Sequence, residues 1–175
     1  MAKPHFGFLS IFFLLISFSS KAQEVNLDSL FRVWNDKTQA DTNRLKAMNK
    51  IAKDGYLYSD PDSAFYFAQI GYDLALSVNN KKWMASALNT QGVSLMYEGN
   101  LEMALEYYLK SLAITEAQGD KKGMGYSYFH LGKVYQDQGN NESALYYYKK
   151  YLNISEEMGE KYGTAASLSN IGNLY

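Results

Sequence analysis

Very few side chains in this sequence have the types and spacing that catalysis or metal binding requires. His130 is one of only two histidines, and its neighbours Phe129 and Leu131 supply no second ligand for a metal ion, which needs several converging donors. Glu156 and Glu157 form a carboxylate pair, but adjacent acids near the end of a predicted helix indicate a solvated surface rather than general acid–base catalysis. We therefore expect no metal site, no cofactor and no catalytic residues, and predict that the protein is not an enzyme.

Motifs for nucleophilic catalysis and for phosphate binding are missing from the sequence as well. There is no cysteine, and neither a G-x-S-x-G nor a G-x-x-x-x-G-K motif occurs. The stretch GMGYSYFHLG contains G-x-G, but it opens a predicted helix instead of following a strand, so it does not indicate a dinucleotide-binding loop. A net charge of -1 without a basic patch argues against nucleic-acid binding. The remaining functional element is a surface.

The first 22 residues have the pattern of a secretory signal peptide. Lys3 gives a basic start, an apolar run follows over residues 6–18, and a small-x-small cleavage site ends at Ala22. The apolar run is shorter than the roughly 20 residues of a membrane-spanning helix. We expect residues 1–22 to be removed on export, which leaves Gln23 as the first residue of a periplasmic or otherwise extracytoplasmic protein. An uncleaved membrane anchor is the alternative.

A repeat with a period of 40 residues fills the rest of the chain. The matching pairs are Gly92 and Gly132, Gly99 and Gly139, Ala104 and Ala144, Tyr108 and Tyr148, and Gly119 and Gly159. A further step of the same length leads from Gly132 to Gly172, so residues 167–175 read as the opening helix of another unit. A fixed period of this size is typical of solenoids built from stacked supersecondary units.

Each unit is predicted to contain two helices and a tight turn. In the second unit, apolar residues recur at steps of three and four over residues 82–97 and 101–118. Gly99 is placed to end the first helix in a left-handed conformation, and Asn100 to cap the second. The same capping role is expected of Asp60, Asn80 and Asp120. The recurrent glycines at 92 and 132 each cost a helix about 1 kcal/mol, so we interpret them as sites of close helix approach, with Ala104 and Ala144 as the matching small surface.

This pattern resembles the tetratricopeptide repeat. The signature positions are Leu88, Gly92, Leu95 and Ala104 in the second unit, and Tyr128, Gly132, Tyr135 and Ala144 in the third. Gln91 stands where the family usually has an apolar residue, Gly55 stands where it has an aromatic one, and the family's period is roughly 34 residues. The resemblance implies an all-α, right-handed superhelical array of antiparallel helix pairs. The implied organisation is an N-terminal helix within residues 23–40, full units at 41–80, 81–120 and 121–160, and an incomplete unit at 161–175.

The whole layout is similar to the exported N-terminal sensor regions of Bacteroidetes signalling proteins. In that group the repeats usually lead to a transmembrane helix and then to a histidine kinase, a nucleotide cyclase or a DNA-binding domain. None of these later parts occurs in the sequence. We therefore expect the chain to be the N-terminal part of a longer signalling protein, with a membrane contact only through an uncleaved signal or a missing downstream segment. The uncovered last helix would favour self-association.

The resemblance also implies where a ligand binds, because the first helix of each pair lines the concave face of such arrays. The implied groove residues are Lys46, Asn49, Lys53, Ser86, Asn89, Val93, Met96, Tyr126, Phe129, Lys133, Gln136, Ala166, Ser169 and Asn173. Amides suit the backbone of an extended peptide, and the lysines favour an acidic one. A protein or peptide is thus the expected partner. A structural or self-assembly repeat without a separate ligand is the alternative.

Overall fold

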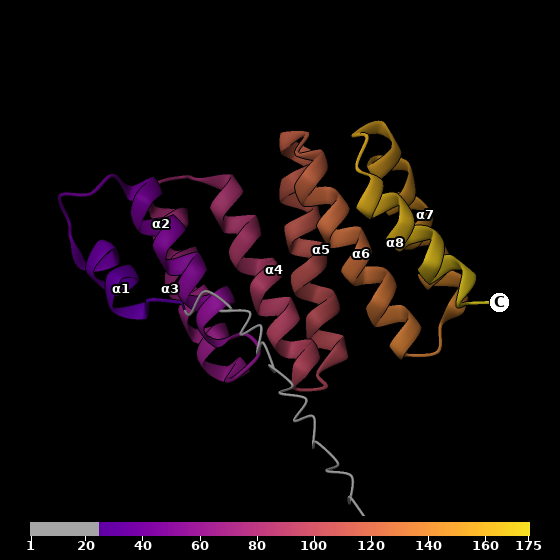
Figure 1. Cartoon of the computed structure of the whole chain (residues 1–175), viewed down its shortest axis with the longest axis horizontal. Coiled ribbons are helices and arrows are strands. Elements are labelled where there is room, and N and C mark those ends of the chain that lie inside the picture. The colour runs from indigo at the N-terminus through magenta and orange to yellow at the C-terminus, as the bar shows by residue number, and fades with distance from the viewer. Residues whose placement is uncertain (1–24) are drawn as a thin grey trace, which may run out of the picture.

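The computed structural model describes residues 25–175 as a row of helices (Figure 1). They are α1 (Leu27–Asn35), α2 (Asp41–Lys50), a π-helical segment (Ile51–Tyr56), α3 (Pro61–Ser77), α4 (Lys81–Tyr97), α5 (Leu101–Gln118), α6 (Lys121–Asp137), α7 (Asn141–Glu157) and α8 (Lys161–Gly172). No strand occurs among these residues, which confirms the predicted all-α class. The predicted signal peptide lies outside the described residues. Within residues 25–175, no helix combines the length and the apolar character that crossing a membrane requires.

The helices are arranged in two rows that run along the molecule (Figure 1). The first helices of the units are α2 with the π-helical segment, α4, α6 and α8, and the second helices are α3, α5 and α7. Each first helix packs against the second helix of its own unit, and α2, α4 and α6 also contact one another. The second helices make far less contact among themselves. The row is therefore tighter on the side of the first helices, which we call the inner face.

The predicted helix ends are confirmed. The side chains of Asn80, Asn100 and Asp120 accept hydrogen bonds from backbone N–H groups inside α4, α5 and α6, as N-caps do. Asp60 caps α3 in the same way, directly before a proline in the first helical turn. Gly99 has a φ of 78°, in the left-handed region where glycine is favoured. Local sequence signals therefore determine where these helices begin and end.

The repeated glycines inside the first helices face tyrosine rings. A Cβ added at Gly92 would lie 2.7 Å from Cε1 of Tyr108, and one added at Gly132 would lie 2.6 Å from ring carbons of Tyr148. Both tyrosines are fully buried. The close approach was predicted correctly, but its partner was not: the nearest atoms belong to the ring one turn beyond Ala104 or Ala144. The alanines are also fully buried.

Each of these rings is also held at its hydroxyl end. The hydroxyl of Tyr108 donates to Sδ of Met96 at 3.2 Å, and that of Tyr148 donates to Oε1 of Gln136 at 2.7 Å. The acceptor lies one turn beyond the glycine on the same first helix. We call the repeated arrangement of glycine, ring and acceptor the tyrosine lock. Because it joins the two helices of one unit, it fixes their relative position at both ends of the ring.

The two departures from the repeat pattern have structural explanations. Gln91 is only 1% exposed, and its amide Nε2 donates to Oε1 of Gln69 on α3 at 2.9 Å. It therefore links two units where the family would use apolar packing. Gly55 lies in the π-helical segment, and a Cβ there would come within 2.7 Å of Leu27 of α1. The space of the expected aromatic residue is thus filled by the N-terminal helix.

Helix α1 is fixed to α2 through one buried arginine. Nε of Arg44 donates to the backbone oxygen of Trp34 at 3.1 Å, and its guanidinium lies 5.0 Å from the centre of the Trp34 ring. The same side chain pairs with Asp41 at 2.9 Å. Stacking on an aromatic face and a planar hydrogen-bonding fork are properties that arginine combines and lysine lacks. The N-terminal helix therefore belongs to the packed array.

Candidate functional site

The groove residues implied by the resemblance all lie on first helices, but they differ widely in exposure. Lys46, Ser169 and Asn173 are exposed, while Asn49, Lys53, Ser86, Met96, Tyr126, Phe129, Lys133, Gln136 and Ala166 are half-buried. Asn89 and Val93 are only 7% and 8% exposed. These two residues can present only a few atoms to a ligand. The accessible part of the inner face is therefore formed mainly by the longer side chains around them.

Two of the groove residues have an internal role. Met96 and Gln136 are the acceptors of the tyrosine locks. Because a hydrogen bond already engages Sδ of Met96 and Oε1 of Gln136, these atoms are less available to a ligand than the sequence pattern suggests. Their shared register in the repeat reflects packing within each unit.

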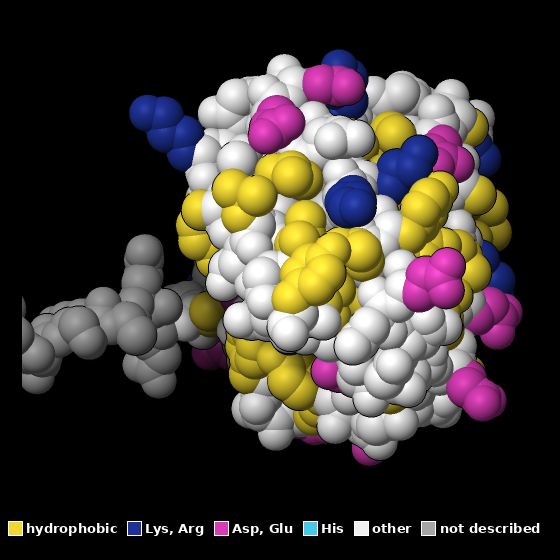
Figure 2. Space-filling model, turned by 90° about the vertical axis from the view of Figure 1, so that its right-hand side faces the viewer, with side chains coloured by type: hydrophobic (Ala, Val, Ile, Leu, Met, Phe, Trp, Pro, Cys, Tyr) yellow, Lys and Arg dark blue, Asp and Glu magenta, His cyan; other side chains and the backbone are white. Residues whose placement is uncertain are grey.

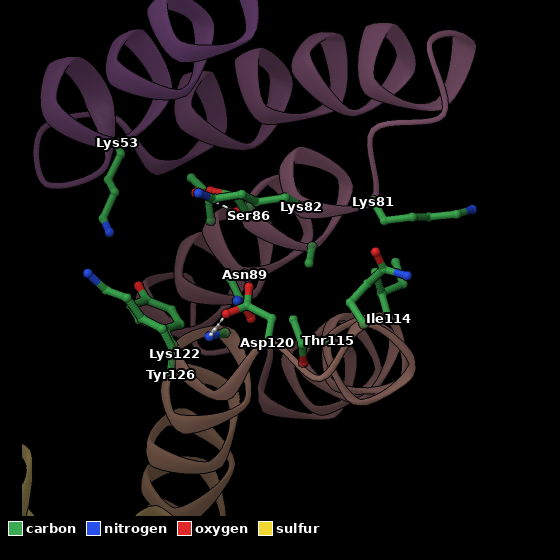
Figure 3. Close-up of a pocket in the computed structure, with 14 residues that line it drawn as sticks. Lys53, Lys81, Lys82, Ser86, Asn89, Ile114, Thr115, Asp120, Lys122 and Tyr126 are labelled. Carbon is green, nitrogen blue, oxygen red and sulfur yellow. Dashed lines mark hydrogen bonds between the residues drawn. The ribbon is translucent and has the colours of Figure 1, made fainter. Parts of the chain in front are cut away.

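Four of the groove residues meet at one cavity of about 430 Å³ (Figure 3). Lys53, Ser86, Asn89 and Tyr126 come from the π-helical segment, α4 and α6. The cavity lies where α4 and α6 begin and α5 ends, and we call it the α4–α6 pocket. Its other lining residues are Lys81, Lys82, Ala85, Thr90, Ile114, Thr115, Gln118, Asp120, Lys122 and Gly123. The sequence prediction missed these, although the pairs Lys81–Lys82 and Lys121–Lys122 recur at the period of 40 residues.

The asparagines of the inner face are held by serines of the next unit. Oδ1 of Asn49 accepts a hydrogen bond from the hydroxyl of Ser86 at 2.8 Å, and Oδ1 of Asn89 accepts one from Ser127 at 3.2 Å. Since an asparagine side chain has an acceptor oxygen and a donor nitrogen, these bonds use the acceptor end. Neither amide nitrogen donates to another group among the described residues. The N–H groups are thus oriented donors for a carbonyl or carboxylate oxygen.

An aromatic cluster lies beside the pocket on the inner face. The ring of His130 stacks on Tyr108 at a centroid distance of 5.1 Å and contacts Tyr126 at 4.4 Å. Nζ of Lys53 lies 5.0 Å from the centre of the Tyr126 ring, within the range of a cation–π interaction. Burial, together with the neighbouring phenols of Tyr58 and Tyr97, raises the pKa of Tyr126 to about 12. Tyrosine at this face therefore stays neutral at physiological pH.

His130 has no titrating role near neutral pH. Burial, reinforced by the positive charges of Lys133 and Lys53, lowers its pKa to about 3. Its Nδ1 is buried and has no hydrogen-bond partner among the described residues. The expectation of a hydrogen-bonded or groove-lining histidine is therefore only half correct: the ring lines the aromatic cluster, but Nδ1 is unpaired. Within residues 25–175, no three His, Cys, Asp or Glu side chains are close enough to hold a metal ion.

Helix α8 forms the C-terminal end of the row (Figure 2). Tyr162 and Leu168 are 86% and 54% exposed there, and Figure 2 shows hydrophobic side chains spread between separate lysines and acids on this end of the molecule. A Cβ added at Gly172 would meet no atom within 4 Å. The groove residues Ser169 and Asn173 thus lie apart from the α4–α6 pocket, and no described cavity joins them to it.

Comparison with known proteins identifies the repeat. Residues 83–157, which include α4, α5, α6 and α7 almost entirely, match the family model described as tetratricopeptide repeat. This segment consists of tetratricopeptide repeats. Tetratricopeptide repeats generally mediate protein–protein interactions and typically form non-catalytic scaffolds. A search of curated protein sequences found no match.

Several solved structures share the fold. BtubC from P. vanneervenii superposes with a TM-score of 0.71 at 17% identity, over 85% of this chain and 61% of that one. The tetratricopeptide repeat domain of Arabidopsis FLU gives 0.61 at 24% identity, over 67% and 99%. A signal transduction ATPase with a tetratricopeptide repeat sensor, PH0952 from Pyrococcus horikoshii, gives 0.70 at 20% identity, over 85% and 24%. The chain therefore spans 61% of BtubC and 24% of PH0952, and at these identities the likeness concerns the fold alone.

Proposed function

We propose that this chain binds a segment of another protein along the inner face formed by α2, α4 and α6. The observation that carries the proposal is the α4–α6 pocket, a cavity of about 430 Å³ that opens on this face. Pockets of this size, lined by apolar surface and a few oriented polar groups, are typical of binding sites. The amide N–H groups of Asn49 and Asn89 supply directional contacts for a peptide backbone, as described above.

Exposed aromatic side chains on the inner face support the same proposal. Tyr97 at the end of α4 is 56% exposed, and Tyr58, which contacts it edge to face at 5.8 Å, is 78% exposed. Tyrosine is enriched among the residues that dominate the energy of protein interfaces, because it buries a large apolar ring and keeps a polar tip. A bound segment could cover both rings while its backbone follows the inner face.

Replacing Tyr97 by alanine tests this function. We expect a segment selected from a random peptide library against the full chain to bind the variant about tenfold more weakly, since loss of an interface tyrosine typically costs more than 1 kcal/mol. Tyr146→Ala is the matched control, because Tyr146 is 55% exposed on the second helix α7. Fluorescence anisotropy titrations give both affinities. Equal losses in the two variants, or failure to select any binding peptide, would contradict binding on the inner face.

We propose further that the chain is exported and acts as a sensor region within a longer signalling protein. The pattern of residues 1–22 supports export, and PH0952 offers a fold-level analogy, since its tetratricopeptide repeats are described as the sensor of a signal transduction ATPase. On this proposal, a ligand on the inner face changes the state of a downstream output domain. Expression of the chain with its own N-terminus in a bacterial host tests the first step.

Export should yield a protein that begins at Gln23. The expected result is a periplasmic product whose intact mass corresponds to residues 23–175, or to the same chain with a cyclised N-terminal glutamine. Ala22→Arg is the control, because a small residue is needed at the cleavage position; it should leave an unprocessed, membrane-associated form. A wild-type product that keeps Met1 in the membrane fraction would instead identify the segment as an anchor.

Self-association through α8 is a second candidate function. The exposed Tyr162 and Leu168, together with the open position at Gly172, favour it. In this case the inner face would have no separate ligand. Failure to select peptides, combined with a concentration-dependent dimer in sedimentation experiments, would favour this candidate over peptide binding.

A further inference from the structure

We infer that the α4–α6 pocket takes an acidic side chain, aspartate or glutamate, from the segment bound on the inner face. This inference rests on the proposed function and adds the chemistry of the partner. It follows from the charges around the pocket, the arrangement of its lysines and the state of its single carboxylate.

The pocket has an excess of positive charge that the chain itself does not neutralise. Its lining includes Lys53, Lys81, Lys82 and Lys122, and Asp120 is the only carboxylate in the lining. Among the described residues, none of these four lysines has a carboxylate oxygen within 4.0 Å. Other lysines of the molecule do find such partners, including Lys121, which directly precedes Lys122 and pairs with Glu157 at 3.0 Å.

Three of the lysines are directed around the same space (Figure 3). Lys53 extends from the π-helical segment and Lys122 from α6, and in the view of Figure 3 their ammonium groups point toward one another across the opening. Lys82 extends from α4 toward the same side, whereas Lys81 points away from the other three. Ammonium groups that share a space without a counter-ion repel one another, and a carboxylate between them removes this repulsion and adds attraction.

The single carboxylate of the lining is already engaged. Oδ1 of Asp120 accepts the backbone N–H of Gly123 at 3.1 Å and so caps α6. Its charge is therefore used mainly at the start of α6, where the helix dipole also favours an anion. The pocket keeps a net positive charge in its presence, and an incoming carboxylate does not have to displace it.

The floor of the pocket suits a carboxylate that is joined to a peptide. Asn89 lies at the floor with its amide N–H groups available, as described above, and Thr90 and Tyr126 complete it. A segment on the inner face would pass directly over this floor, so one of its side chains can enter while its backbone stays on the face. Protein carboxylate is thus the source of the anion to which the inference commits.

Selection from a phage-displayed library of random dodecapeptides tests the inference on the full chain. Peptides selected on the wild type should be enriched in aspartate and glutamate, and peptides selected on the triple variant Lys53→Gln, Lys82→Gln and Lys122→Gln should not be. The control triple variant, Lys37→Gln, Lys149→Gln and Lys150→Gln, removes the same charge at exposed positions outside the pocket. It should select the same acidic peptides as the wild type.

Affinities of one selected acidic peptide give the size of the effect. The pocket triple variant should bind it about tenfold or more weakly, while the control variant should change the affinity less than about twofold. Asp120→Asn should strengthen binding about two- to fivefold, because it removes the opposing charge and asparagine caps a helix as well as aspartate does. High salt should weaken the wild type more than the pocket variant.

The possible failures are distinguishable. If binding peptides are selected but carry no acidic enrichment, or if both triple variants weaken the acidic peptide equally, the inference is wrong and the proposed function stands. If no peptide is selected on any variant, the proposed function fails and this inference fails with it. If citrate or inorganic phosphate occupies the pocket and the selected peptides do not compete with it, the pocket serves a small anion and the inference is overturned.

Discussion

Replacing Gly132 by leucine should lower the free energy of unfolding by about 3 kcal/mol, at the upper end of the usual cost of overpacking a core. The reason is the contact in the tyrosine lock, where even a Cβ would lie 2.6 Å from two ring carbons of Tyr148. The ring is fully buried, and its hydroxyl is bound to Gln136 at 2.7 Å. It therefore has little freedom to move away. Urea denaturation of the variant and the wild type measures the difference.

Alanine substitutions at two glycines of α6 provide the matched control. Gly125→Ala should raise the free energy of unfolding by about 0.5–1 kcal/mol, because alanine is the better helix former and the nearest atom to its Cβ would be 3.4 Å away. Gly132→Ala gains the same helix propensity but must displace the Tyr148 ring, so it should be destabilising. If both alanine variants were equally stabilised, the ring would move freely and the tyrosine lock would not constrain the unit.

Lowering the pH from 7 to 5 should cost the folded chain about 2 kcal/mol through His130 alone. Its pKa falls from an ordinary value of 6.5 to about 3 in the folded state, chiefly through burial. Between these values the unfolded chain binds a proton that the folded chain does not. Stability is therefore complete above about pH 7 and declines as the pH falls toward 3. Lys133 and Lys53 face the ring with positive charge, and Tyr108 and Tyr126 pack against it without negative charge.

His130→Phe isolates this effect, because it keeps an aromatic ring in the cluster and removes the titrating group. Urea denaturation at both pH values should show a smaller loss in the variant than in the wild type, by about 2 kcal/mol. The carboxylates titrate in both proteins and cancel in the comparison. Identical pH dependence of the two proteins would show that His130 is protonated in the folded state without cost.

The parts of the fold that depend on neighbouring residues could be predicted from the sequence. Helix α5 runs from Leu101 to Gln118, the range expected from its apolar spacing, and the cap at Asn100 and the left-handed Gly99 lie where they were predicted. Such signals act over a few residues, so they can be read without knowledge of the packing. The π-helical segment was not predicted, since it lies where Leu27 of α1 packs against Gly55.

Contacts between helices were harder to predict. The glycines indicated close approach, but whether Ala104 or Tyr108 fills the space depends on side-chain direction, which residue spacing does not specify. The same limitation applies to the inner face. Met96 and Gln136 share a register with groove residues, yet both turn toward a buried tyrosine hydroxyl.

The α4–α6 pocket combines both cases. Lys53, Ser86, Asn89 and Tyr126 were implied by the resemblance to the repeat family, because they occupy equivalent faces of successive first helices. Lys82 and Lys122 come from the first turns of α4 and α6, outside the usual groove positions. They join the site only because the beginnings of these helices and the end of α5 converge, which is a property of the array and not of one unit.

The bonds between Ser86 and Asn49 and between Ser127 and Asn89 also have a mechanical consequence. They connect successive first helices, whereas the second helices make little contact with one another. In an array where each unit contacts mainly its neighbours, the molecule behaves as a short spring whose stiffness is concentrated along one edge. Opening its curvature must stretch these two hydrogen bonds, while closing it meets less resistance. A segment lying across both asparagines would add connections along that edge, so binding would stiffen the spring and transmit force from one end of the row to the other.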